Sequence, residues 1–421
     1  MLAEKQLVKK VNKTAGRYAL QCLDTNHCIS IDDFSPYIVV SETRDQGETW
    51  EEKFRFESKT VHPFFTGIKS SYVLDENHMY FASWQRGILA YTSDGGKTIE
   101  HTEMGTFTNG AEYMHMMDTL RGIIPNGNSI TVTHDGWKTW TDIATYKQGK
   151  PGNHLINFHA LPRSDSTYYI TSTYNQGTFE EPEYIKCLYE FNINTYEIDT
   201  IYLFPAHPDD IDMLYDPILY FLNDSIGFYG GSVHRSDDYF RDVVLYKTID
   251  GGKSWYKVLD HFDSKSWGAE DLAMRDSLYG IIASRPNRLY ETFDGGETWE
   301  FVLIEDEGSH VLMFVEFAGQ EAIIGSLANG MYKWEEPDTT DVGIKETKYM
   351  RVKHKNNHLF IFTKYNNLNI SIYDIRGQLW IDEKIFQSGN INLQSLQNGV
   401  YFYNISTIGQ IVKTGKFSII N

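Results

Sequence analysis

An eight-residue pattern occurs five times in this chain and constrains its fold more than any other feature. It reads Thr, any residue, Asp, any residue, Gly, any residue, Ser or Thr, and Trp. The copies start at Thr43, Thr92, Thr133, Thr248 and Thr292. Trp137 replaces the Gly in the third copy, and Ile99 replaces the Trp in the second. A motif that returns every few tens of residues indicates a fold built from repeated units.

Each copy contains what a turn between two strands needs to fasten itself. The Asp carboxylate can accept backbone N–H bonds within the turn, and the Gly permits a positive φ. The hydroxyl groups add local bonds, and the Trp folds back as an apolar plug. The pattern is that of the Asp-box, for which we expect a structural role. The residues concerned are Asp45, Asp94, Asp135, Asp250, Asp294, Trp50, Trp140, Trp255 and Trp299.

The spacing of the Asp residues predicts the number of units. Successive copies lie 49 (45 to 94), 41 (94 to 135), 115 (135 to 250) and 44 (250 to 294) residues apart. A four-stranded propeller blade takes about 40–50 residues, so the long interval holds two blades. A degenerate turn at Phe191–Tyr196 stands in for the missing copy. A further blade is predicted from strand-like segments at Val311–Phe317, Glu321–Ser326 and Gly330–Trp334.

A second register supports this count. Gly110 to Asp118 aligns without a gap to Gly268 to Asp276, and the same Gly-to-Asp distance recurs from Gly16 and from Gly67. Each such segment is expected to form the innermost strand of a blade. The first blade then begins near Gly16, which leaves Gln6–Val11 to supply the outer strand of the last blade. This exchange would close the ring and remove an exposed sheet edge.

The composition changes near residue 337. We expect a linker at 337–347 and a second domain at 348–421, with strands at His358–Thr363, Asn369–Asp374, Leu379–Phe386 and Gly399–Ser406. Turns are predicted at Asp374–Gly377 and Gln397–Gly399. The predicted fold class is therefore all-β: a seven-bladed β-propeller at 1–336, followed by a small antiparallel β-sandwich.

The second domain resembles the C-terminal sorting domain of the type IX secretion system. The resemblance lies in Ile370–Gly377, Ile391–Leu393, Leu396–Phe402 and Val412–Phe417. It implies a secreted or cell-surface protein of a Bacteroidetes-type bacterium, which the secretion machinery recognises through 348–421 and from which this domain is usually removed. An ordinary accessory sandwich is the alternative.

Charge and hydropathy limit the partners. The 38 Lys and Arg residues against 57 Asp and Glu residues give a net charge of −19, which disfavours nucleic acid. No apolar run reaches the roughly 18 residues of a transmembrane segment. Met1–Gln6 lacks the apolar region of a leader peptide, so we expect the sequence to begin after the cleavage site. Cys22 and Cys28 could bridge in an oxidising compartment, but three buried free thiols, these two and Cys187, are the expected state.

The propeller segment resembles two families that share Asp-boxes, the sialidase-like glycosidases and the photosystem II assembly-factor-like propellers. The second resemblance is closer and lies in Val73–Phe81 and Gly87–Gly96. It implies a binding or assembly role. Sialidases need an Arg-Ile-Pro segment and form six blades, whereas the nearest segment here, Phe54–Phe56, follows the first Asp-box. Xyloglucanase-like enzymes use two tandem propellers, and this chain has room for one.

The register also predicts a site. Two residues after the glycines that start the inner strands, near one rim of the channel, stand Tyr18, Lys69, Glu112, His154, Glu270 and His310. Trp84 and Arg86 lie in a loop that could stack a sugar or peptide. Polar groups at one repeat position could bind a ligand, or simply line a hydrated channel mouth. The rim and His207–Asp210 both contain residue types that can bind a metal ion, but we expect neither a metal nor a cofactor.

We therefore expect an exported, non-catalytic binding or assembly propeller with a glycan or protein ligand at the channel rim. The alternative is a glycoside hydrolase that uses a carboxylate pair at the same rim, with Glu112 and Glu270 as the catalytic candidates.

Overall fold

The computed structural model describes residues 9–12, 19–83, 87–105, 113–126, 129–144, 156–175, 184–204, 215–234, 241–261, 268–286, 288–303, 312–319, 321–326, 330–334, 350–355, 358–363, 368–385, 389–407 and 410–419. The chain divides into two compact units, the first formed by Met1–Thr292 and Gly296–Glu335 and the second by Glu336–Asn421 together with Phe293–Gly295. Both units consist of antiparallel strands, and the predicted all-β fold class is confirmed.

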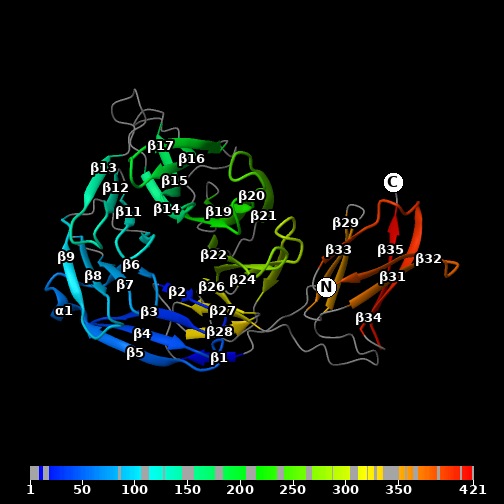
Figure 1. Ribbon diagram of the computed structural model, residues 1–421, viewed down its shortest axis with the longest axis horizontal. Coiled ribbons are helices and arrows are strands. Elements are labelled where there is room, and N and C mark those ends of the chain that lie inside the picture. Colours follow the sequence, from blue (N-terminus) through cyan, green and yellow to red (C-terminus); the bar gives the residue numbers. More distant parts are fainter. Residues whose placement is uncertain are drawn as a thin grey trace. The chain divides into compact units, whose positions relative to one another are not determined.

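The first unit is a β-propeller whose four-stranded sheets are arranged in a ring (Figure 1). We number these blades in chain order. Blade one contains β2 (Ala19–Cys22), β3 (Cys28–Phe34), β4 (Tyr37–Thr43) and β5 (Glu51–Glu57). Blade two contains β6 (Ile68–Val73), β7 (Met79–Ser83), β8 (Ile88–Thr92) and β9 (Glu100–Glu103). Between them lies the short helix α1 (Ser58–Val61).

The next four blades follow the same order, from an inner first strand to an outer fourth strand. Blade three contains β10 (His115–Met116), β11 (Gly122–Asn126), β12 (Ser129–Thr133) and β13 (Thr141–Ala144). Blade four contains β14 (Ile156–Pro162), β15 (Thr167–Asn175), β16 (Tyr184–Asn192) and β17 (Ile198–Phe204). Blade five contains β18 (Tyr215–Phe221), β19 (Gly227–His234), β20 (Arg241–Thr248) and β21 (Tyr256–His261). Blade six contains β22 (Gly268–Met274), β23 (Gly280–Arg285), β24 (Arg288–Thr292) and β25 (Glu300–Leu303).

Blade seven closes the ring with a strand from the other end of the unit. Its three consecutive strands are β26 (Leu312–Ala318), β27 (Glu321–Ser326) and β28 (Gly330–Trp334). The outer strand is β1 (Lys9–Asn12), which pairs antiparallel with β28. The exchange expected from the sequence is thus present, and it covers what would otherwise be an unpaired sheet edge.

The repeated eight-residue motifs form turns between the third and fourth strands, which we call repeat turns. In the first, Thr49 donates its backbone N–H and its hydroxyl to the two oxygens of Asp45, at 2.8 and 2.6 Å. The Thr43 hydroxyl donates to Asp45 Oδ1 and accepts the N–H of Gly47. The same bonds recur at Asp94, Asp135 and Asp250.

The turns between the first and second strands carry a second repeated set of bonds. Asp24 Oδ1 accepts the N–H groups of Asn26 and His27, at 2.7 and 2.8 Å. Equivalent bonds recur at Asp75, Asp118, Asn223 and Asp276. A backbone bond then joins the two turns of a blade, as from Gly95 to Asn77 in blade two. The blades that carry these motifs are therefore fastened at one end by local bonds, which explains why the motif is visible in sequence.

Blade four lacks the Asp motif and uses Asn192 instead. Asn192 Oδ1 accepts the N–H groups of Asn194 and Thr195, at 2.9 and 3.1 Å. The N–H of Ile193 donates to the Ser166 carbonyl, the link that Gly95 makes in blade two. The degenerate turn predicted at Phe191–Tyr196 thus joins β16 and β17.

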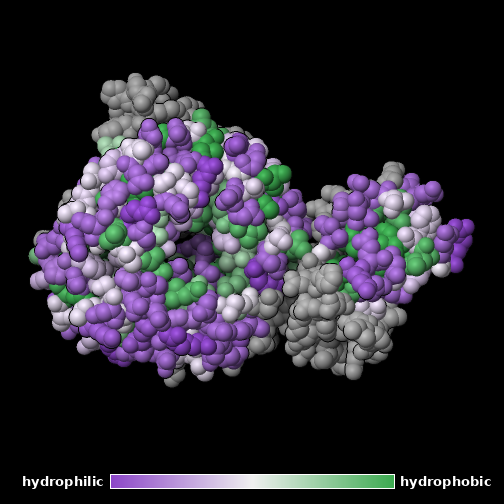
Figure 2. All heavy atoms as spheres, in the orientation of Figure 1, coloured by the Kyte–Doolittle hydropathy of each residue, from purple (hydrophilic) through white to green (hydrophobic). Residues whose placement is uncertain are grey.

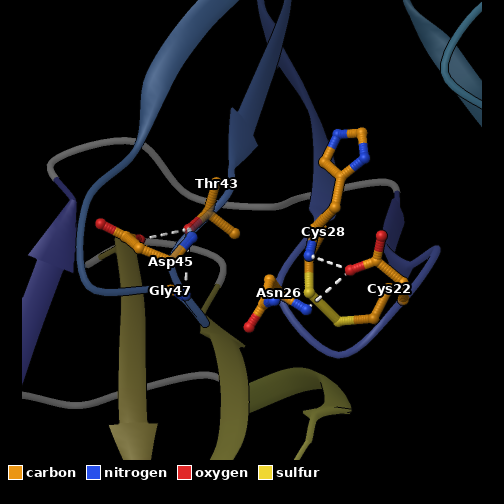
Figure 3. Close-up of a disulfide and its surroundings, with 8 residues drawn as sticks. Cys22, Asn26, Cys28, Thr43, Asp45 and Gly47 are labelled. Carbon is orange, nitrogen blue, oxygen red and sulfur yellow. Dashed lines mark hydrogen bonds between the residues drawn. A yellow bond between two sulfur atoms is a disulfide. The ribbon is translucent and has the colours of Figure 1, made fainter.

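A disulfide joins Cys22 and Cys28 across the first turn of blade one (Figure 3). The expectation of free thiols at these two positions was wrong. The antiparallel register places Cys22 directly opposite Cys28, with their Cα atoms 3.9 Å apart, so the hairpin itself brings the sulfurs together. Cys187 is buried and is not part of this disulfide.

Hydrophobic clusters lie between neighbouring blades. One combines Ile29 and Val40 of blade one with Phe81 and Ala90 of blade two, all fully buried. Others join blades two and three, three and four, four and five, five and six, and seven and one. Each blade buries both of its faces against its neighbours, so the core is a ring of interfaces.

The second unit is a small antiparallel β-sandwich. One sheet contains β29 (Met350–Lys355), β30 (His358–Thr363) and β33 (Gly389–Asn392). The other contains β32 (Leu379–Ile385), β31 (Leu368–Asp374), β34 (Gly399–Thr407) and β35 (Gln410–Ile419). Leu359 and Ile391 of the first sheet share a core with Ile370 and Tyr403 of the second. The predicted turn at Asp374–Gly377 is present, whereas β29, β33 and β35 were not predicted.

Candidate ligand site on the inner strands

Two of the eight candidate ligand-binding residues, Lys69 and Glu270, lie within the part of the chain that the structure describes. Both are half-buried on inner strands, Lys69 on β6 and Glu270 on β22. The other candidates lie outside the described residues. They are Tyr18, Trp84, Arg86, Glu112, His154 and His310, and His207–Asp210 also lies outside. Whether these side chains converge at one rim therefore stays a prediction.

Glu270 forms a partly buried ion pair with Arg285 at the end of β23. The Glu270 side chain is 4% exposed and that of Arg285 is 24% exposed. The Arg285 guanidinium thus lies against the Glu270 carboxylate within the same blade. Arg288, in the same loop, is buried and donates to the Pro286 carbonyl. The arginines of this loop thus bond within the blade.

Asp94 and Asp135 of the repeat turns are unsuited to donate protons at neutral pH. The backbone N–H and the hydroxyl of Thr98 lower the pKa of Asp94 to about 2. Desolvation raises the pKa of Asp135, but hydrogen bonds from Thr139 and its neighbours outweigh it and the net shift is downward. These carboxylates stay charged at neutral pH and act as acceptors within their turns.

A group of polar side chains that the sequence reading missed lies further along the inner strands. Each of the seven innermost strands carries one such residue, and each residue is partly exposed. We call them the inner ring: Gln21, Tyr72, His115, His159, Tyr220, Asp271 and Glu316. The face shown in Figure 2 is hollowed at the centre of the propeller, with hydrophilic surface inside. Solvent therefore reaches these inner strands through the central hollow.

One half of the inner ring is a hydrogen-bonded group of neutral side chains. The Tyr72 hydroxyl lies 3.0 Å from Nε2 of His115, and the two rings are 4.6 Å apart. Burial raises the pKa of Tyr72 to about 12, against an opposing hydrogen bond with Gln21. Burial, and then the neighbouring His159, lowers the pKa of His115 to about 3. These groups therefore carry no charge at neutral pH.

Two polar atoms in this half are buried without a partner. Among the residues that the structure describes, neither Nδ1 of His115 nor the hydroxyl of Tyr168 has a hydrogen-bond partner. The Tyr168 ring packs edge-on against His115, with ring centroids 5.5 Å apart. Nearby, Tyr113 stacks on His159 at 4.4 Å. Buried polar atoms left unpaired cost free energy, and these two atoms lie out of reach of a molecule in the solvent.

The other half of the inner ring contains two carboxyl groups on neighbouring blades. Burial raises the pKa of Asp271 to about 7, although the N–H of Val315 donates to its Oδ2 at 3.0 Å. Burial, and then the charge of Asp271, raises the pKa of Glu316 to about 8. The two groups repel each other when both are charged, so they titrate together near neutral pH. Burial also raises the pKa of Tyr220, which adjoins them.

The sequence carried a signal for part of this ring. Gln21, Tyr72 and His115 each stand three residues before the Asp of the first turn of their blade. The reading from the sequence used the position two residues after the glycine, and so it selected the channel rim instead. Tyr220 likewise stands three residues before Asn223, whereas Asp271 stands five residues before Asp276, so the ring residues do not all share one repeat position.

Comparison with family models finds one match. Residues 355–420 match the family described as a secretion system C-terminal sorting domain. The protein is therefore exported, to the medium or to the cell surface, and is handled by the secretion machinery that recognises this domain. A comparison of the sequence with curated proteins finds no significant match. None of the helices described is long and apolar enough to cross a membrane.

Solved structures share the propeller fold at low sequence identity. YCF48 bound to D1 peptide aligns with a TM-score of 0.53 at 15% identity, over 80% of this chain and 96% of that one. YCF48 from Cyanidioschyzon merolae aligns with a TM-score of 0.51 at 14% identity, over 78% and 97%. The extracellular domain of BT4673 from B. thetaiotaomicron aligns with a TM-score of 0.50 at 13% identity. That match covers 91% of this chain and 48% of the other.

Proposed function

We propose that this exported propeller is a non-catalytic binding or assembly protein that holds a glycan or protein ligand in its central channel. The observation that carries this proposal is the inner ring, one polar side chain from each inner strand. The partial exposure of these side chains supports it, because a ligand with hydroxyl or amide groups could hydrogen-bond to them. The predicted rim residues would form the outer part of the same site.

The comparison with YCF48 supports a binding role by analogy only. One of those structures is described as bound to a D1 peptide, so this type of propeller can hold a peptide. Aromatic rings beside neutral hydrogen-bonding groups also suit sugars, whose hydroxyl groups need both donors and acceptors. Both peptides and glycans are therefore candidate ligands.

A glycoside hydrolase is the second candidate, and the raised pKa values of Asp271 and Glu316 favour it. A carboxyl group that is protonated near neutral pH can act as a general acid, while its neighbour stays charged. The pair first expected to act was Glu112 and Glu270; Glu270 forms an ion pair with Arg285, and Glu112 lies outside the described residues.

Binding and turnover on arrays of glycans and peptides distinguish the two. We expect a bound ligand that is recovered intact, with affinity at least tenfold lower in Tyr72→Phe. Tyr91→Phe is the matched control, because its hydroxyl bonds to Glu100 within the same blade but away from the inner strands. A His154→Ala, His310→Ala double variant tests the rim in the same assay. Cleavage of a glycan that Glu316→Gln or Glu270→Gln abolishes would instead establish the hydrolase.

Two finer assignments belong to this proposal. The repeat turns are Asp-box (BNR) repeats of the kind found in photosystem II assembly-factor-like propellers, as the bonds around Asp45 and its equivalents support. The domains are 1–336 and 348–421, joined by a linker at 337–347.

A further inference from the structure

Three metal-ligating side chains meet on the outer side of blade two, away from the inner ring. They are His62, which follows α1 in the connection from blade one, and His101 and Glu103, which lie on the outer strand β9. Residues two apart on a strand point to the same side, so β9 presents His101 and Glu103 together. Each of the three offers one ligand atom, and these atoms lie within 4.8 Å of one another.

The distances suit one small metal ion. His62 Nε2 lies 3.0 Å from Glu103 Oε1, and the rings of His62 and His101 are 5.4 Å apart. In a tetrahedral site with bonds of about 2.0 Å, two ligand atoms stand about 3.3 Å apart. The His62 side chain is 13% exposed and so is held in place, whereas that of Glu103 is 65% exposed and can adjust. Closing the site needs the ligand atoms, which now lie within 4.8 Å of one another, to approach to about 3.3 Å.

A simple surface ion pair would not account for the second histidine. Blade two provides the comparison, because His78 bonds to Asp75 at 2.9 Å within its own turn. At the His62 cluster, in contrast, two imidazoles from separate elements converge on one carboxylate. Two histidines that both gain a proton would repel each other there, while a shared cation attracts all three groups.

The ring proton of His62 must move from one nitrogen to the other when the ion binds. The exposed N–H of Phe64 now donates to Nδ1 of His62 at 3.2 Å, which leaves the ring proton on Nε2. A metal bound at Nε2 needs that proton on Nδ1, so the N–H of Phe64 would turn to water. The bond lost is long and exposed, and a solvent bond replaces it.

We propose that His62, His101 and Glu103 bind one divalent ion of the zinc class, through two imidazole nitrogens and one carboxylate oxygen. Imidazole donors favour zinc and its neighbours over calcium and magnesium, which prefer oxygen. Three protein ligands leave a fourth position for water or for a ligand from another molecule. The bound ion would tie the connection between blades one and two to the outer strand of blade two.

Zinc titration of the untagged full-length protein, followed by calorimetry and by thermal unfolding, tests this site. We expect one equivalent of Zn²⁺ to bind and to raise the Tm. His101→Ala should weaken binding at least tenfold and remove the Tm increase, and Glu103→Gln should weaken it as well. His78→Ala is the matched control and should bind as the native protein does. Less than one equivalent bound at 100 µM Zn²⁺, or equal affinity in His101→Ala and His78→Ala, would overturn the proposal.

Discussion

Trp137 stands where four of the repeat turns have glycine, and its backbone adopts a φ of 68°. A tryptophan in this left-handed region is strained. At the other turns, a side chain of the preceding blade packs against the glycine, as Phe54 does at Gly96 and Phe228 at Gly296. Trp137 instead fills the interface from the turn itself, packing fully buried against Tyr80 of blade two.

Substitution of Trp137 separates strain from packing. Loss of a buried indole costs about 3–5 kcal/mol, and the left-handed backbone about 1–2 kcal/mol. Trp137→Gly loses the packing but relieves the strain, so its free energy of unfolding should fall by about 2–3 kcal/mol. Trp137→Ala keeps the strain, so its free energy of unfolding should fall further. Urea unfolding measures both, and an alanine variant as stable as the glycine variant would contradict this reading.

For single residues, the sequence could predict those whose hydrogen bonds lie within one turn. Asp45 and Thr49 bond within one turn, so their spacing alone identified it. The filling role of Trp137 depends on a neighbouring blade and could not be read from spacing. The disulfide could have been predicted, because the turn at Asp24 places Cys22 opposite Cys28 in the paired strands.

At the scale of elements, the inner strands β22 and β26 bring Asp271 and Glu316 together. Both carboxyl groups have a pKa above that of an unfolded chain, so folding binds protons more tightly. Their contribution to stability is present below about pH 4, the unfolded pKa, and is lost as the pH rises through about 8. The native protein should therefore lose stability between these limits.

Glu316→Gln tests this contribution, because the amide cannot lose a proton. We expect the variant to be more stable than the native protein at pH 9, by about 2 kcal/mol, with little difference at pH 5. Glu51→Gln, at the exposed start of β5, serves as control. Urea unfolding at the two pH values provides the measurement, and an equal dependence on pH in both proteins would refute the account.

The elements themselves were predicted unevenly. Strands flanked by the repeated turns were found, and so was the exchange of β1 into blade seven. The inner ring was missed because its residues do not share one repeat position: Tyr72 stands three residues before Asp75, whereas Asp271 stands five residues before Asp276. In the second unit, β29, β33 and β35 were not predicted, although the sequence has the turn-type residues Ser388 and Gly389 at the start of β33 and Gly409 before β35.

At the scale of the whole molecule, closure depends on four residues at the start of the chain. β1 pairs only with β28, and β28 would be an exposed edge without it. Deletion of residues 1–12 should lower the Tm of the propeller by about 5 °C or more and promote self-association through β28. Deletion of 336–421 is the control and should leave that transition unchanged, as the two units are compact on their own. An unchanged Tm after the first deletion would contradict a closing role for β1.

Export and fold are features of the whole chain, and the repeat and the sorting segment made both predictable. The proposed binding site was not predictable, because the inner ring forms only when seven separate strands meet around one channel. The central claim is that this ring binds a ligand without transforming it. The most direct measurement is the affinity for the ligand found on the arrays, compared in the native protein, Tyr72→Phe and Tyr91→Phe. The account predicts intact ligand throughout and at least a tenfold loss in Tyr72→Phe alone, whereas equal affinity in all three, or a cleaved ligand, would contradict it.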